Sequence, residues 1–381
     1  KQEKDLVRIQ NVIAALEGSE FRDEWIIAGS HYDAWGFGAS DPNSGTAMLL
    51  CLAEALGELK QKGMGPKRTI KIAHWDAEEH GIIGSTEWVE QWRDELDKKA
   101  VAYFNADGAV SGLNFGGSAA PSLKNLMIEA ARTVPYLNTK QTVYEHWMTR
   151  AADKAAGPPI GNLGGGSDHL PFYAHVGIPS LSAGLGGPTL YHSNYDDFYW
   201  YSHFADTSFT AGPTVTKMMG IMALRMANAA VLPFEVSRYG TDLHKHLSDA
   251  AKRIQAYQPS FDITPLLKAS QNILEKGKRL DSLISVHLKT KPNAKTLAAL
   301  NGELLILERN FIDPTGQAYG SWYRSLYASS DPFSGYASWM LPGFLYEASL
   351  KSSDNLPALE QRHMDALKRL ESAIDRMLKR L

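Results

Sequence analysis

The sequence lacks several features that would assign it to whole classes of protein. It has a single cysteine, Cys51, among 381 residues, which excludes an internal disulfide framework and fits a reducing compartment or an exported protein without disulfides. No apolar run reaches the ~20 residues that a membrane helix needs. With a net charge of −3 and no basic run, the sequence also gives no indication of a nucleic-acid partner.

The first residues, KQEKDLVRIQNVIAALEGSE, contain neither an initiator Met nor the apolar core of a signal peptide. From this we expect the chain to begin within a domain. What is present is ordinary for a globular protein, since 44% hydrophobic and 21% charged residues can bury a sizeable core. At roughly 100–200 residues per domain, the length favours two domains.

Short apolar runs alternate with helical patterns over the first part of the chain. The candidate strands are EWIIAGSH (24–31), RTIKIAHWD (68–76), AVAYFNAD (100–107) and GIPSLSAG (177–184). Helix-like segments, such as 44–62 and 122–133, lie between them. This alternation predicts an α/β domain with a mostly parallel central sheet flanked by helices, whose chemistry lies beyond the carboxyl ends of the strands.

From about residue 235 the pattern becomes helical. Apolar residues recur at helical spacing from Leu266 to Ile284 and again from Met364 to Leu378. We therefore expect one domain over 1–234 and a helical domain over 235–381. The apolar stripes are typical of a core or a subunit interface rather than a ligand site, because amphipathic helices bury their apolar faces.

Potential metal ligands follow all four candidate strands. In chain order they are His31, Asp33, Asp41, Asp76, Glu78, Glu79, Asp107 and His192. Two histidines and several carboxylates at one edge of a sheet suit zinc, which accepts nitrogen and oxygen ligands. The set is too large for one tetrahedral site with an open position, and it suits two ions that share a bridging carboxylate.

The adjacent Glu78 and Glu79 fit such a site in different roles. One glutamate would bind metal, and its neighbour, which points elsewhere, can reach a metal-bound water as general base. Taken singly, a histidine is more often structural, a strand-end aspartate more often caps a turn, and a glutamate pair more often begins a solvated helix. Their joint occurrence at successive strand ends favours the metal site.

Four segments in this order resemble the glutamate carboxypeptidase II and transferrin receptor family of co-catalytic zinc peptidases. They are GSHYDAWGFGASDPNSG, HWDAEEHGIIGSTEW, YFNAD and LYHS. NAAVLPFE (228–235) and LLILERNFIDPTG (304–316) are similar to the family's helical dimerisation domain, so the resemblance covers essentially the whole chain. It implies a zinc exopeptidase fold followed by an all-α dimerisation domain, a homodimer, and two zinc ions per chain.

The resemblance also implies a role for each residue that matches the family's motifs. The implied zinc ligands, with Asp41 as the bridge, are His31, Asp41, Glu79, Asp107 and His192. Glu78 is the implied general base, and Asp33 the carboxylate that orients the ligands. Water held between the metals would lose its proton to Glu78 and attack a carbonyl polarised by zinc, and the proton would pass to the leaving amine.

The implied substrate contacts lie in three further segments. Tyr191 is similar to the tyrosine that steadies the tetrahedral intermediate, and the remaining contacts are Gly166, Ser167 and Tyr336. Glu87 and Glu90 resemble two ligands of a structural calcium site. The alternative for that pair is an exposed helix face.

Two departures from the family's pattern bear on the substrate. Glutamate carboxypeptidase II holds an acidic substrate with arginines just before its YHS motif, but GIPSLSAGLGGPTLYHS (177–193) contains neither Arg nor Lys. The family's Lys-Tyr pair is matched by Gly335-Tyr336. Because burying a substrate carboxylate without a partner is costly, we expect neutral side chains at the site rather than selectivity for acidic residues.

Several alternatives stay open at this point. GGGSDH and the lost cations favour an aminopeptidase, whereas the overall match favours a carboxypeptidase. A non-catalytic, transferrin-receptor-like binding protein is the alternative class, against which the intact ligand set argues. The resemblance further implies that the apical, protease-associated insertion and the first protease segment either occupy a separate piece of the same protein or are missing from this form. It also implies a secreted, periplasmic or extracellular-facing location.

Overall fold

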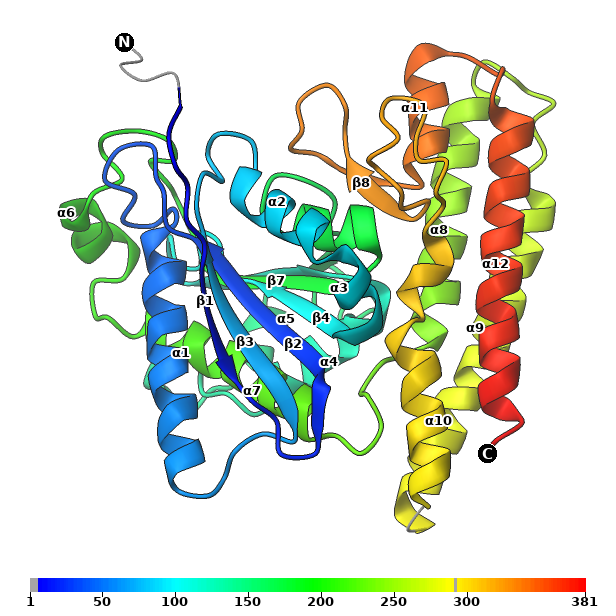
Figure 1. The fold of residues 1–381 in the computed structure, drawn as a ribbon. Helices are drawn as coiled ribbons and strands as arrows, with labels where there is room; N and C mark the ends of the chain where they lie inside the picture. The colour runs from blue at the N-terminus through cyan, green and yellow to red at the C-terminus, as the bar shows by residue number, and fades with distance from the viewer. Residues whose placement is uncertain (1–5, 291–292) are drawn as a thin grey trace.

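The computed structural model describes residues 6–290 and 293–381 (Figure 1). A sheet with helices on both faces lies beside a bundle of long helices. The elements of the first part are β1 (Val12–Leu16), β2 (Phe21–His31), α1 (Asn43–Gln61), β3 (Arg68–Trp75), α2 (Ile83–Gln91), α3 (Arg93–Lys99), β4 (Ala100–Asn105), β5 (Asn114–Ala119), α4 (Lys124–Ala131), α5 (Val143–Met148), β6 (Ile160–Gly161), β7 (Ser180–Gly186), α6 (Phe198–Trp200) and α7 (Ala211–Asn228). Those of the second part are α8 (Ser237–Gln255), α9 (Thr264–His287), α10 (Ala294–Leu305), β8 (Ala328–Ser330), β9 (Ser338–Met340), α11 (Pro342–Leu350) and α12 (Leu356–Leu378).

The central sheet has seven strands in the order β1-β3-β2-β4-β7-β5-β6. Strands β3, β2, β4 and β7 are parallel, while β1 and β5 run antiparallel to their neighbours β3 and β7. The predicted sheet flanked by helices is confirmed, and all four candidate strands overlap observed ones. The pattern missed β1, β5 and β6, because β1 is largely exposed, β5 is rich in glycine and β6 has only two residues.

Two layers of helices explain why the inner strands are apolar on both faces. Along β2, Ile26 and Ala28 face the large core, which also contains residues of α1 and α7, whereas Trp25 and Ile27 face a smaller cluster with residues of α2 and α3. Every residue of β4 is buried. The carboxyl ends of these strands are therefore held in fixed positions by packing on both sides.

The second part packs α8, α9 and α12 side by side (Figure 1). It is not entirely helical, since the segment between α10 and α11 contains the antiparallel pair β8–β9. One large hydrophobic core includes buried residues from Ile26 to Met377, so the division at residue 234, which falls between α7 and α8, stays a prediction. Over the described ranges, no helix has the length and apolar character to cross a membrane.

The β8–β9 hairpin packs closely against the Gly-rich run GNLGGGSD. A side-chain carbon on Gly164 would lie 2.3 Å from Ser338 Cα, and one on Gly165 would lie 2.4 Å from the Gly335 carbonyl oxygen. Only glycine allows this approach. The run therefore lets the second part of the chain reach the edge of the sheet where the candidate ligands lie.

Candidate metal centre

The structure brings the five expected ligands together beyond the carboxyl ends of the parallel strands. His31 ends β2, Glu79 follows β3, and Asp107 follows β4. Asp41 lies just before α1, and His192 lies in the loop after β7. Parallel strands end at one edge of a sheet, which is why residues far apart in the sequence meet there.

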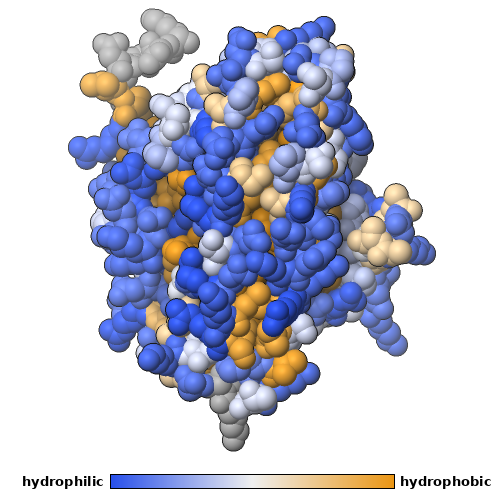
Figure 2. Space-filling model, turned by 90° about the vertical axis from the view of Figure 1, so that its right-hand side faces the viewer, coloured by the Kyte–Doolittle hydropathy of each residue, from blue (hydrophilic) through white to orange (hydrophobic). Residues whose placement is uncertain are grey.

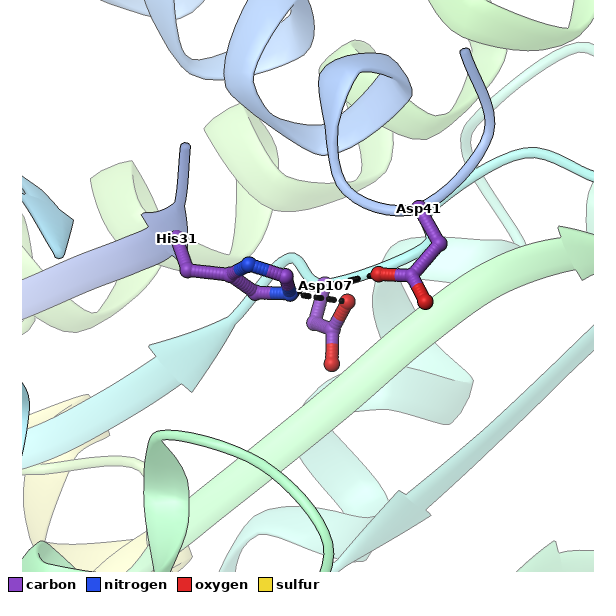
Figure 3. A group of neighbouring side chains, drawn as sticks. All are labelled: His31, Asp41 and Asp107. Carbon is purple, nitrogen blue, oxygen red and sulfur yellow. Dashed lines mark hydrogen bonds and ion pairs between the residues drawn. The ribbon is translucent and has the colours of Figure 1, made fainter. Parts of the chain in front are cut away.

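The first group consists of His31, Asp41 and Asp107 (Figure 3). His31 Nε2 lies 3.0 Å from Asp107 Oδ1 and 3.2 Å from Asp41 Oδ1. The ring points toward both carboxylates. The three side chains offer nitrogen and oxygen atoms within 4.8 Å of one another, a spacing that can hold a metal ion.

The second group consists of Asp41, Glu79 and His192. His192 Nε2 lies 3.0 Å from Glu79 Oε2 and 3.4 Å from Asp41 Oδ2. The two oxygens of Asp41 therefore face different histidines, Oδ1 toward His31 and Oδ2 toward His192. This geometry is compatible with a carboxylate shared between two neighbouring metal ions.

Crowding of negative charge makes the cluster a candidate site for cations. Burial, followed by the charge of Asp41, raises the pKa of Glu79 to about 7. Burial, followed by the charge of Asp168, raises the pKa of Glu78 to about 9. Burial alone would lower the pKa of His31, but hydrogen bonds that its ring donates to Asp107, Asp33 and Asp41 raise that pKa well above the usual range. A bound cation would offset this repulsion between carboxylates.

Asp33 orients the expected ligands through hydrogen bonds to His31 and to the backbone of Glu78 and Glu79. Its carbonyl oxygen lies 2.9 Å from His31 Nδ1, so Nδ1–H can donate there and Nε2 is left as the ligand atom. Its carboxylate accepts the backbone N–H of Glu78 at 3.0 Å and of Glu79 at 3.2 Å. Asp33 thus connects the loop after β2 to the loop after β3.

Asp196 is a supporting residue that the sequence reasoning missed. It is 2% exposed, and its carboxylate accepts the backbone N–H groups of Ser40 at 2.8 Å and of Asp41 at 3.0 Å. Because Asp196 follows His192 by four residues, it ties the loop of one ligand to the loop of another. The only sequence feature that could have indicated this role is the acidic pair in LYHSNYDD, and such a pair is more typical of a turn.

Ser167, an expected substrate contact, is buried and turned toward the metal centre. Its hydroxyl donates to Asp107 Oδ2 at 2.7 Å and accepts from Asn105 Nδ2 at 2.8 Å. It therefore positions Asp107 in this structure. Its contact with substrate stays a prediction, and Asn105 is a second supporting residue that the sequence reasoning missed.

Three other expected substrate contacts meet beside His192. The Tyr191 ring stacks on the His192 ring with centroids 3.6 Å apart, and its hydroxyl lies 3.4 Å from that of Tyr336. Gly166 has φ +79° and lies against Tyr336. Both tyrosines are exposed to solvent.

Glu87 and Glu90, the expected calcium ligands, are both exposed on α2. Trp322 Nε1 donates to Glu90 Oε1 at 2.5 Å. Among the residues that the structure describes, the metal-compatible groups do not include this pair.

An α/β sheet with two overlapping histidine–carboxylate groups beyond its strand ends defines a candidate metalloenzyme. The family model described as Peptidase family M28 matches residues 11–208, over half of the chain. The chain therefore belongs to peptidase family M28.

Curated relatives agree with the resemblance drawn from the motifs. The chain is 38% identical over 340 residues to a probable glutamate carboxypeptidase, LAMP1, of Arabidopsis thaliana, with 89% of this chain and 49% of the relative covered. It is 31% identical over 329 residues to aminopeptidase NAALADL1 of Rattus norvegicus, with 81% and 44% covered. The chain thus spans about half the length of the curated relatives it matches.

Solved structures also resemble the chain, with lower sequence identity than these curated relatives. A zinc aminopeptidase from Bacillus subtilis, BSAP, superposes with a TM-score of 0.43 and 21% identity, over 57% of this chain and 50% of that chain.

Proposed function

We propose that the chain is the catalytic part of a zinc-dependent exopeptidase that hydrolyses small peptides. The observation that carries this proposal is the shared carboxylate of Asp41, which lies between His31 and His192. Membership of peptidase family M28 supports peptide hydrolysis. We propose two zinc ions per chain, because each of the two groups offers one histidine and two carboxylates and both include Asp41.

Bound zinc would polarise the peptide carbonyl and lower the pKa of the attacking water. We assign the proton transfer to Glu78, and this is supported by its Oε2, which lies 3.8 Å from His31 Nε2, and by Asp33, which accepts its backbone N–H. It takes a proton from water and returns it to the leaving amine. We assign substrate orientation, and hydrogen bonds to the oxygen that gains charge, to Tyr191 and Tyr336, whose hydroxyls lie 3.4 Å apart.

Aminopeptidase action is the second candidate. The curated relatives include both glutamate carboxypeptidases and aminopeptidases, and the alignments with the two kinds cover similar shares of this chain. Residues 177–193 contain neither Arg nor Lys, so the cations expected of a peptidase that selects glutamate are absent from this segment. This favours an aminopeptidase. A non-catalytic, transferrin-receptor-like role is the third candidate and is the least supported, because all five ligand positions converge.

Four further features belong to this proposal. A homodimer formed through the helical part is supported by apolar side chains exposed on the face in Figure 2, and Val286, Leu288 and Ile306 are exposed residues of that part. Calcium at Glu87 and Glu90 is supported only by their shared exposure on α2. We also propose a separate apical segment in the same protein and a secreted, periplasmic or extracellular-facing location.

A panel of small peptides with a blocked N-terminus, a blocked C-terminus or neither tests the proposal. Zinc-loaded protein should cut at least one class, and Glu78→Ala should cut none while still binding zinc. Cleavage of N-acetyl peptides but not of C-terminal amides indicates a carboxypeptidase, and the reverse indicates an aminopeptidase. If zinc binds and no peptide is cut, the binding-protein alternative replaces the enzyme.

A further inference from the structure

The two histidines of the candidate metal centre are held in different ways. His31 Nδ1 lies 2.9 Å from the Asp33 carbonyl oxygen, and this hydrogen bond fixes the ring with Nε2 facing the carboxylates. Among the hydrogen bonds and ion pairs of the described residues, those of the His192 side chain all involve Nε2, which faces Glu79 and Asp41. The orientation of the His192 ring therefore depends on other contacts.

The backbone of His192 makes such support necessary. Its φ is +56°, in the left-handed region that residues with a side chain seldom adopt. A conformation of this kind persists only where the surrounding structure holds it. The side chain is also partly exposed, so the protein encloses only part of the ring. Neighbouring side chains are therefore needed to keep Nε2 directed at the carboxylates.

Two aromatic side chains contact the His192 ring from different directions. The Tyr191 ring stacks on it, with centroids 3.6 Å apart and planes 19° apart. The Trp35 indole meets it edge to face, with centroids 6.5 Å apart and planes 60° apart, which is an arrangement that aromatic pairs prefer. Because the two contacts differ in direction, Trp35 limits the sliding of the imidazole that stacking alone would allow.

The backbone of Trp35 contacts a second expected ligand. Its N–H donates to Glu79 Oε1 at 3.2 Å, while Glu79 Oε2 lies 3.0 Å from His192 Nε2. Trp35 therefore contacts both members of the second group other than the shared Asp41. It makes no such contact with His31 in the part of the chain that the structure describes.

Trp35 is itself held between two loops. Its ring packs against the His80 ring, with centroids 5.3 Å apart. The next residue, Gly36, has φ +93°, and a side-chain carbon there would lie 3.0 Å from Asn194 Oδ1. Glycine thus lets the turn after Trp35 come close to the loop that carries His192. The Trp35 side chain is nevertheless 47% exposed, so its replacement does not open a cavity in the core.

We propose that Trp35 is a positioning residue for the second group and that its indole holds the His192 ring with Nε2 directed at Glu79 and Asp41. At His192 the indole has the role that the hydrogen bond to Nδ1 has at His31. The inference rests on the two zinc ions of the proposed function, but it does not depend on peptide cleavage. It assigns Trp35 to one of the two zinc positions only.

A double-mutant cycle read out as zinc affinity tests the inference, with competition against a chelator as the measurement. Trp35→Ala should weaken one zinc equivalent by roughly tenfold, the typical loss when a group that orients a ligand is removed, and should leave the other within about twofold. His192→Ala should remove the same equivalent. Because Trp35 acts through His192, Trp35→Ala should not change zinc binding further once His192 is replaced.

Two further variants serve as controls. Trp35→Phe keeps an aromatic ring at this position and should restore most of the zinc affinity. Trp92→Ala also removes an exposed indole, but Trp92 lies at the opposite end of α2 from Glu79, so both zinc equivalents should bind as in the parent. The midpoint of urea denaturation without zinc should stay the same in Trp35→Ala and the parent, which reports an intact fold.

Parent zinc affinity in Trp35→Ala, or an equal loss in Trp92→Ala, would overturn the inference. So would a tenfold loss on Trp35→Ala that persists in the His192→Ala background, because it would show a general structural role. Failure of the proposed function gives different results. If Trp35→Ala selectively weakens one zinc equivalent but the parent cuts no peptide, the inference stands and the peptidase is rejected. If His192→Ala binds two zinc ions as tightly as the parent, the ligand assignment is wrong and the inference fails with it.

Discussion

Replacing Asp196 by alanine tests whether one buried carboxylate holds two ligand loops together. The side chain accepts the backbone N–H groups of Ser40 and Asp41, and it lies four residues after His192. Removing it leaves both N–H groups without their acceptor and frees the loop that carries the bridging carboxylate. We expect a loss both of folding stability and of metal affinity.

The magnitude follows from these two hydrogen bonds. A buried donor left unsatisfied costs about 1–3 kcal/mol, so two of them cost about 2–6 kcal/mol, with about 3 kcal/mol expected because water can enter beside the loop. Loss of a group that orients metal ligands typically lowers metal affinity about 10- to 100-fold. Zinc affinity should fall by that factor in Asp196→Ala.

Asp206→Ala is the matched control. Asp206 is also buried and accepts three backbone N–H groups at the start of α7, at 2.9, 2.9 and 3.1 Å, but it does not contact a ligand loop. Urea denaturation should show comparable destabilisation of both variants, and competition with a zinc chelator should show weaker binding only in Asp196→Ala. If Asp196→Ala loses stability but binds zinc with parent affinity, the carboxylate supports the fold and does not position the ligands.

Three further predictions concern the buried ion pair, acid stability and metal binding. Lys124→Met should cost about 1.5–3 kcal/mol in urea denaturation, because it removes the charge-assisted hydrogen bond to buried Asp242, 2.6 Å away, while Arg238 remains 2.8 Å from the same carboxylate. Burial lowers the pKa of His246 to about 4. Below pH 6.5 the unfolded chain therefore binds a proton that His246 in the folded chain does not, which should cost about 2 kcal/mol of stability at pH 5, and His246→Phe should remove that share of the acid loss. Zinc at about a thousand times its Kd should stabilise the fold by about 4 kcal/mol in scanning calorimetry, and an unchanged shift in Asp41→Asn would contradict the shared-ligand arrangement.

Local sequence patterns predicted the inner strands because those strands are buried on both faces. β2, β3 and β4 read as apolar runs, and each ends at, or is followed within two residues by, a histidine or aspartate that the core would not accept. The same reasoning missed β5, whose glycines carry no β-strand signal of their own. Strand β5 is held in place by antiparallel pairing with β7, and no local pattern identifies which strand its neighbour will be.

By itself the sequence determined the sheet with its helices, the family, and the residues expected to bind metal, because strand ends, apolar periodicity and contiguous motifs are local properties. Only the tertiary structure decided which oxygen of Asp41 faces which histidine, and that Asp196 supports its loop. It also decided that Tyr336 meets Tyr191 from the far part of the chain. These contacts join residues far apart in the chain, and their partners are chosen by packing rather than by spacing along the sequence.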